Sequence, residues 1–169
     1  MSGDARARSR LVACDALLGP PPVAPPGYLP DVADLEAEMS RLGIDASVVR
    51  HRASIDANGD WGNKVLMEEI SGHARLIPAW FVTPDGYEPH FEPKLLVDHL
   101  LAAGVRLAWT DPTAQAFSLQ AWCSGRLLRA LQQRRLPLLL SYSQVPLGDL
   151  HQALEAYPQL RVILLDLPR

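Results

Sequence analysis

Six short apolar runs, separated by amphipathic segments, constrain the fold of this chain more than any other feature. The runs begin roughly every 25–35 residues. They occupy residues 11–14, 46–49, 76–82, 105–109, 136–141 and 161–165. Each run is continuously apolar, which is typical of parallel strands that are buried on both faces by covering helices. The sequence therefore predicts an α/β fold of parallel (β/α) repeats, with about six strands and five helices.

The segments between the runs carry signals for helix ends. Asp31 is expected to cap the first helix and Gly43 to end it. Asp60 is expected to cap the second helix, and Ser118 the fourth. Trp122 is placed on the apolar face of the fourth helix.

Length and composition indicate one globular domain over residues 1–169. The chain has 48% hydrophobic and 21% charged residues, enough to bury a core without disulfides. Its formal net charge of −3 argues against a nucleic-acid partner recognised mainly through phosphates. A complete (β/α)8 barrel needs about 250 residues. In a barrel, this chain is therefore expected to lack the last βα units.

Cysteine usage and the absence of targeting signals predict a cytoplasmic protein. Cys14 and Cys123 are far apart and have no metal-ligand spacing, so both are expected to be reduced thiols. The basic N-terminus is not followed by the uninterrupted apolar region of a signal peptide. No apolar run approaches the ~20 residues that span a bilayer, so no membrane partner is expected.

The connection after the first run separates two sheet architectures. Residues 19–30 are long and rich in proline, and they contain neither GxGxxG nor GxxxxGK[ST]. A long loop at this place is more common where βα loops build the active-site face of a barrel. An open flavodoxin-like sheet that binds a small ligand remains the alternative, and it predicts a reversal of strand order near the first strand.

Four segments carry a family resemblance. Residues 14–19 (CDALLG), 42–49 (LGIDASVV), 73–78 (HARLIP) and 103–106 (AGVR) resemble successive segments of the amidohydrolase superfamily. The closer similarity is to its amidohydrolase-2-like branch, the metal-dependent hydrolases of the TIM-barrel fold, which also contains decarboxylases. The resemblance implies an incomplete TIM-barrel-like fold, a small-molecule substrate and a divalent metal, Zn or Mn, that activates water or polarises a carbonyl.

The family's metal ligands are only partly matched. The resemblance implies a His-x-His motif after the first strand, where this chain has Asp15, Ala16 and Leu17. An aspartate can bind a divalent ion through oxygen, whereas a leucine cannot bind one at all. The family's histidines after the fifth and sixth strands correspond to Ser141 and a position near Asp166. Any metal site is therefore expected to be weak or absent.

Polar residues follow several of the expected strands. Asp15, His51, Asp111 and Asp166 follow the first, second, fourth and sixth apolar runs, so they are expected to converge at one edge. His51 could act as acid, base or metal ligand, with Asp15 and Asp166 as further ligands. The alternatives are a loop histidine bound to backbone, a turn at Asp111 and a strand-end cap at Asp166.

Three more residues lie near this edge. Tyr142 follows the fifth run and could hydrogen-bond a carbonyl or carboxylate of the substrate, or simply pack. Arg106 and Trp109 could form an anion clamp and a platform inside a barrel, or they could face the helices. Asn63 is expected to organise a βα loop at a helix start.

The resemblance implies a hydrolase or decarboxylase that acts on a small organic acid or amide. His51, Asp111 and Tyr142 are its expected catalytic residues, and Asp15, His51 and Asp166 its expected metal ligands. The alternative is a catalytically silent scaffold or a truncated product. In that case the open edges of the first and sixth strands would pair with another copy of the chain.

Overall fold

The computed structural model describes residues 10–168, except residues 22, 24–25 and 87–91. Its strands lie side by side in the order β1-β2-β3-β4-β5-β6, and every neighbouring pair is parallel. The strands are β1 (Val12–Leu18), β2 (Ala46–His51), β3 (Leu76–Phe81), β4 (Leu107–Thr110), β5 (Leu138–Ser141) and β6 (Val162–Leu165). The predicted parallel (β/α) repeat is confirmed. The order has no reversal, so the flavodoxin-like alternative is wrong.

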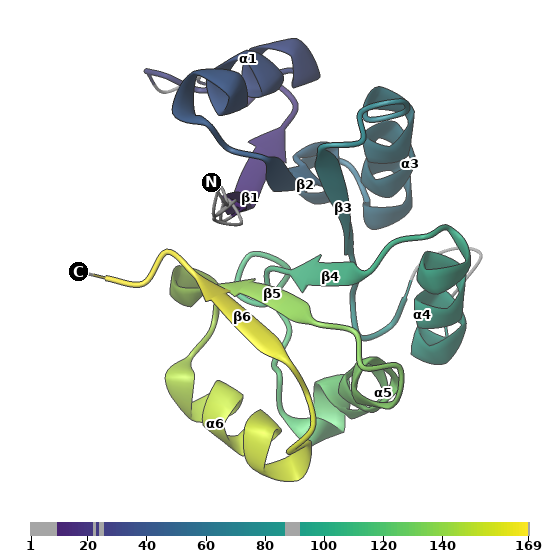
Figure 1. Cartoon of the computed structure of the whole chain (residues 1–169). Helices are drawn as coiled ribbons and strands as arrows, with labels where there is room; N and C mark the ends of the chain where they lie inside the picture. Colours follow the sequence, from purple (N-terminus) through teal and green to yellow (C-terminus); the bar gives the residue numbers. More distant parts are fainter. Residues whose placement is uncertain (1–9, 22, 24–25, 87–91, 169) are drawn as a thin grey trace, which may run out of the picture.

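Helices connect the strands and lie on their outer side (Figure 1). They are α1 (Val32–Leu42), α2 (Ala53–Asp56), α3 (Gly59–Glu69), α4 (Pro93–Ala102), α5 (Ala121–Gln133) and α6 (Leu147–Ala156), with a 3-10 turn η1 (Tyr142–Gln144). The described residues thus contain six α-helices where the sequence predicted five. The additional one, α2, has only four residues and was too short to show a periodic pattern.

The predicted ends of α1 are confirmed by its capping contacts. An Asp31 side-chain oxygen accepts a hydrogen bond from the Asp34 backbone N–H at 2.9 Å. Gly43 follows the helix with φ of 69°, in the left-handed region that glycine adopts without strain. Local capping chemistry was therefore sufficient to locate this helix.

Two other capping predictions were wrong. Asn58, not Asp60, caps α3, because its side-chain oxygen accepts from the Trp61 N–H at 2.8 Å. Asp60 lies within the first turn instead. Helix α5 begins after Gln120, and the side-chain oxygen of Ser118, two residues before Gln120, accepts from the Gln120 N–H. At α3 a second polar residue nearby offered an equivalent oxygen, which sequence spacing could not distinguish. At α5, Gln120 takes the cap position without a side-chain capping bond.

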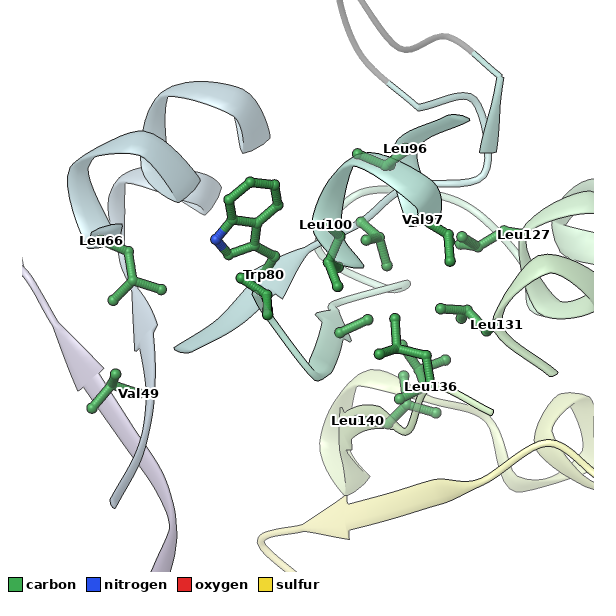
Figure 2. Close-up of a cluster of buried hydrophobic side chains, with 14 of the residues drawn as sticks. Val49, Leu66, Trp80, Leu96, Val97, Leu100, Leu127, Leu131, Leu136 and Leu140 are labelled. Atoms are coloured by element: carbon green, nitrogen blue, oxygen red, sulfur yellow. The ribbon is translucent and has the colours of Figure 1, made fainter. Parts of the chain in front are cut away.

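The strands bury side chains on two faces. On the outer face, Leu66, Trp80, Leu100 and Leu131 belong to one large core between strands and helices (Figure 2). On the inner face a smaller cluster comprises Val48, Ala79, Phe81, Trp109, Leu139 and Leu165. Trp80 and Phe81 are neighbours in β3 and face opposite sides, as alternation along a strand requires.

The prediction that Trp122 packs into the core was wrong. Its side chain is 79% exposed, and its indole N–H donates to the Gln120 side-chain oxygen at 2.9 Å. Trp122 lies in the first turn of α5, before the buried stripe that includes Leu127, Leu128 and Leu131. The spacing of apolar residues along α5 did not reveal that only the later turns of this helix are buried.

Asn63 links the end of β3 to α3 by hydrogen bonds. Its side-chain amide donates to the Phe81 carbonyl at 3.0 Å and accepts from the Phe81 N–H at 2.8 Å. Asn63 is only 2% exposed, so these bonds are shielded from water. The expectation that Asn63 organises a βα connection agrees with these contacts.

Replacing Asn63 by leucine should destabilise the fold. The Asn63→Leu variant removes both side-chain bonds to buried backbone groups of Phe81, which is expected to lower the free energy of unfolding by about 2 kcal/mol. Urea denaturation followed by circular dichroism would measure this change. The neighbouring Lys64→Ala serves as control because Lys64 is 63% exposed and its ion pair among the described residues is with Asp60, one turn earlier. Equal stability of the two variants would contradict the role of Asn63.

Candidate functional site

Four polar or aromatic side chains meet on the inner face of the sheet. Asp15 lies in β1, Arg50 in β2 and Trp109 in β4, and Asp111 directly follows β4. Arg50 is two residues after Val48, whose side chain belongs to the inner cluster, so both point to the same side of β2. We call Asp15, Arg50, Trp109 and Asp111 the inner polar cluster.

Asp15 and Arg50 form a two-pronged ion pair. The Nε and Nη2 atoms of Arg50 each donate to one carboxylate oxygen of Asp15 at 2.7 Å. The Arg50 side chain is only 8% exposed, whereas that of Asp15 is 27% exposed. This planar geometry is the one in which an arginine binds a carboxylate most strongly. The pair thus links a buried cation to the protein surface.

Trp109 supports the Arg50 guanidinium from one side. The guanidinium carbon lies 4.8 Å from the centre of the Trp109 ring, within the range of a cation–π interaction. Trp109 is fully buried, and Phe81 packs against it edge-on with ring centres 4.7 Å apart. The Trp109 ring and the Asp15 carboxylate hold the guanidinium, and Phe81 in turn holds the ring, so the guanidinium has a fixed position.

Asp111 is the second carboxyl of the inner polar cluster. Burial raises its pKa above the ordinary value of 3.8, the positive charge of Arg50 opposes this rise, and the charge of Asp15 adds to it. Asp111 is 7% exposed, and its Oδ1 atom is buried without a hydrogen-bond partner in the described structure. A buried carboxyl of this kind retains its proton to higher pH than an exposed aspartate.

The inner polar cluster keeps unused bonding capacity. Beyond Oδ1 of Asp111, the indole N–H of Trp109 is buried without a partner, and the Nη1 atom of Arg50 donates to no described residue. Unpaired buried donors and acceptors are costly unless something binds them. The arrangement can therefore recognise an anion through Arg50 and exchange a proton through Asp111.

His51 lies on the opposite, helix-facing side of β2. Its Nδ1 atom accepts from the Ala53 N–H at 3.1 Å, and its Nε2 atom is 3.4 Å from a carboxylate oxygen of Glu69 in α3. Gly19 lies so close to the ring that a Cβ there would be 2.9 Å from it. His51 follows Arg50 directly, so alternation along the strand turns it away from the inner polar cluster.

The expected metal ligands are not brought together. Both oxygens of Asp15 are bound to Arg50, and His51 contacts α2 and α3 instead. Asp166 is exposed after β6, with a φ of 56°. Within the described residues, no group of three or more His, Cys, Asp or Glu side chains could hold a metal ion. The donors present do not fit the metal that the family resemblance implies.

The other predicted residues take separate positions. Tyr142 begins η1 directly after β5 and is half-buried. Arg106 is exposed and donates to the backbone carbonyls of Leu101 and Val105, so it is not the inner anion clamp. Trp109 faces the inner side, which agrees with the predicted platform inside a barrel and not with the alternative of a residue that faces the helices.

Arg50 is the residue that sequence reasoning did not single out. Its position did carry a signal, because it ends an apolar run in which both faces were expected to be buried. A charged residue in such a strand needs a buried partner. The partner, Asp15, lies 35 residues earlier and could be found only through the pairing of β1 with β2.

Solved structures show the architecture to which this chain belongs. An uncharacterized TIM-barrel protein from Bordetella bronchiseptica matches 90% of this chain with a TM-score of 0.62 and 14% identity. A probable 2-pyrone-4,6-dicarboxylic acid hydrolase from Acinetobacter baumannii, with citric acid bound, matches 92% with a TM-score of 0.63 and 14% identity. This chain covers 66% and 58% of their lengths, less than two thirds of each. Its fold is an incomplete TIM-barrel-like α/β fold.

No protein-family model and no curated protein match the sequence. The described part of the chain contains no helix that is both long and apolar enough to cross a membrane. Cytoplasmic location and the assignment of residues 1–169 to one domain stay predictions.

Removing Asp15 should leave a buried charge without its partner. The Asp15→Ala variant is expected to lower the free energy of unfolding by about 3 kcal/mol, because Arg50 is too buried to regain full hydration. The double variant Asp15→Ala/Arg50→Met removes the charge as well and should recover more than about half of this loss. Urea denaturation of all variants measures both effects. A double variant less stable than Asp15→Ala would contradict the proposed pairing.

Asp111 should make stability fall with rising pH. Its pKa is raised on folding, so the folded chain binds the proton more tightly than the unfolded chain. The stabilisation is complete below the ordinary value of 3.8 and is lost as the pH rises through the raised folded value. Asp111→Asn should therefore gain stability relative to the natural chain above about pH 4. Denaturation at several pH values tests this, and a constant difference between the two proteins would refute it.

Proposed function

We propose that this chain acts as a hydrolase or decarboxylase on a small organic acid or amide, with the inner polar cluster as its site. The observation that carries the proposal is a buried Arg50, held over Trp109, beside the proton-retaining carboxyl of Asp111. In TIM-barrel enzymes the site lies at the carboxyl ends of the strands, where Arg50 and Asp111 are located. The resemblance to the amidohydrolase superfamily supports the same reaction classes.

Arg50 would recognise a carboxylate of the substrate. A guanidinium presents its N–H groups in a plane that matches a carboxylate, and Nη1 of Arg50 has no described partner. The similar hydrolase is named for a dicarboxylic acid and holds citric acid. We therefore propose a substrate with at least one carboxylate.

Asp111 would exchange the proton of the reaction. In decarboxylation of a β-keto acid, neutral Asp111 donates its proton to the keto oxygen while the bond to the carboxylate breaks. The electron pair of the broken C–C bond forms the double bond of the enol, and CO2 leaves. In hydrolysis of an amide, ionised Asp111 accepts a proton from the water that adds to the carbonyl carbon, and it returns this proton to the amine nitrogen as the C–N bond breaks. Because the described donors do not fit a metal, neither step is assigned to one.

Two residues from the sequence analysis keep proposed roles near this site. Tyr142 follows β5 at the same sheet edge and could donate a hydrogen bond to a substrate carbonyl. His51 could act only from behind β2, where it contacts Glu69. We give the proton transfer to Asp111 because it faces the same side as Arg50.

A second candidate function is that of an oligomerising scaffold. Strands β1 and β6 end the sheet, each with one edge unpaired within the described structure. Val12 in β1 and Ile163 in β6 are 43% and 37% exposed. Unpaired strand edges with apolar side chains favour pairing with another chain. This candidate requires no chemistry at the inner polar cluster.

Citrate binding and turnover distinguish the two functions. Calorimetry should detect citrate binding by the natural chain, and Arg50→Lys should weaken it about tenfold because the planar donor pair is lost. Asp111→Asn should lower kcat for β-keto acids or small amides by roughly 100-fold while citrate still binds. Arg41→Gln, an exposed change on α1, is the control for both measurements.

Light scattering completes this experiment. A monomer of 18.6 kDa that binds citrate through Arg50 supports the enzyme proposal. A stable dimer without citrate binding or turnover would overturn it in favour of the scaffold. Circular dichroism of Arg50→Lys excludes loss of folding as the cause of weakened binding.

A further inference from the structure

A cavity of about 380 Å³ lies on the helix layer. It runs along α5, between the start of α4 and the residue that follows α6, and these helices lie on the outer side of the strands (Figure 1). Its polar lining comes from Glu92, Lys94, Arg126, Arg129, Gln133 and Tyr157. None of the residues of the inner polar cluster lines it. The cavity is therefore separate from the site proposed above.

The lining of this cavity is positively charged. Three cations, Lys94, Arg126 and Arg129, face a single carboxylate, Glu92, which pairs with Arg126. Lys94 pairs with Asp98 outside the cavity lining, and Arg129 has no ion pair within the described structure. This local excess of positive charge occurs in a chain whose formal net charge is −3. The charge of the cavity is thus opposite to that of the protein as a whole.

Like charges are held close together here. Arg126 and Arg129 are three residues apart on α5, a spacing that makes side chains neighbours on a helix and like charges mutually destabilising. Helix α5 contains no acidic residue to separate them. A bound anion would offset this repulsion.

Tyr157 adds a hydroxyl to the cavity wall. Its side chain is only 7% exposed, yet its hydroxyl has no hydrogen-bond partner among the described residues. A Cβ at Gly125 would lie 2.8 Å from the hydroxyl oxygen. The hydroxyl can therefore occupy this position only because residue 125 is a glycine. The residue as a whole is buried while its hydroxyl lies at the cavity, where it can donate a hydrogen bond. The unused donor points to a ligand that accepts hydrogen bonds.

We propose that this cavity binds a small molecule that carries a phosphate group. A phosphate has a charge between about −1.5 and −2 at neutral pH and several strong acceptor oxygens. It therefore matches the surplus of cations and the free tyrosine hydroxyl. Arginines suit phosphate because their planar N–H groups bind two oxygens at once. A volume of 380 Å³ lies in the range of small-molecule sites, roughly 300–1,000 Å³.

Calorimetry and thermal unfolding with inorganic phosphate and pyrophosphate test the proposal. Both probes should bind saturably and raise Tm, whereas sodium chloride at the same ionic strength should not. Arg129→Gln and Tyr157→Phe should each weaken pyrophosphate binding about fivefold or more, because each removes one donor to the anion. Gly125→Ala should weaken it by displacing the Tyr157 hydroxyl.

Two controls keep the experiment specific. Arg41→Gln removes an equal charge from α1 and should leave pyrophosphate binding unchanged. Arg50→Lys alters the inner polar cluster and should also leave it unchanged, so failure of one site is distinguishable from failure of the other. Arg129 is exposed, and its replacement leaves the core intact. The proposal is overturned if Arg129→Gln binds pyrophosphate as the natural chain does, or if sodium chloride raises Tm equally.

Discussion

Burial on both faces of a parallel sheet is the constraint on which the rest of this structure depends. The strands from β2 to β6 pack one row of side chains against the helices and turn the other row to the inner side. Trp80 and Phe81 show this division in adjacent positions of β3. Where both faces of a strand are buried, as in β2 and β5, a polar side chain is destabilising unless a partner satisfies it. The few polar groups on the inner face are therefore the most informative residues of the chain.

The inner polar cluster satisfies this requirement only in part. Arg50 is balanced by Asp15 and supported by Trp109, so its charge is well compensated. Asp111 is not, since one of its oxygens is buried without a partner and burial raises its pKa. Incomplete compensation of this kind is more typical of sites that bind or transform a ligand than of structural ion pairs. In the cavity beside α5, on the helix layer, polar groups are also incompletely compensated, because the hydroxyl of Tyr157 has no described partner and lies among cations.

The success of sequence reasoning depended on how local each signal was. The alternation of apolar runs and the cap at Asp31 depend on neighbouring residues, and both were predicted correctly. The caps of α3 and α5 were each misplaced by two residues, at α3 because two polar side chains could serve as the cap. His51 was expected at the shared edge because it ends a strand. Its orientation depends on the parity of the strand relative to the core, and a continuously apolar run does not reveal parity.

The sequence by itself determined the fold class, because the spacing of apolar runs admits only parallel strands joined by helices. It also located Asp111 at the end of the fourth strand, whereas Asp15, expected to follow the first strand, lies within β1. Only the tertiary structure decided that Arg50 joins them, that His51 faces the helices, and that the expected metal ligands stay apart. The physical reason is that these relations depend on the pairing of strands about 35 residues apart in sequence and on which face each side chain occupies.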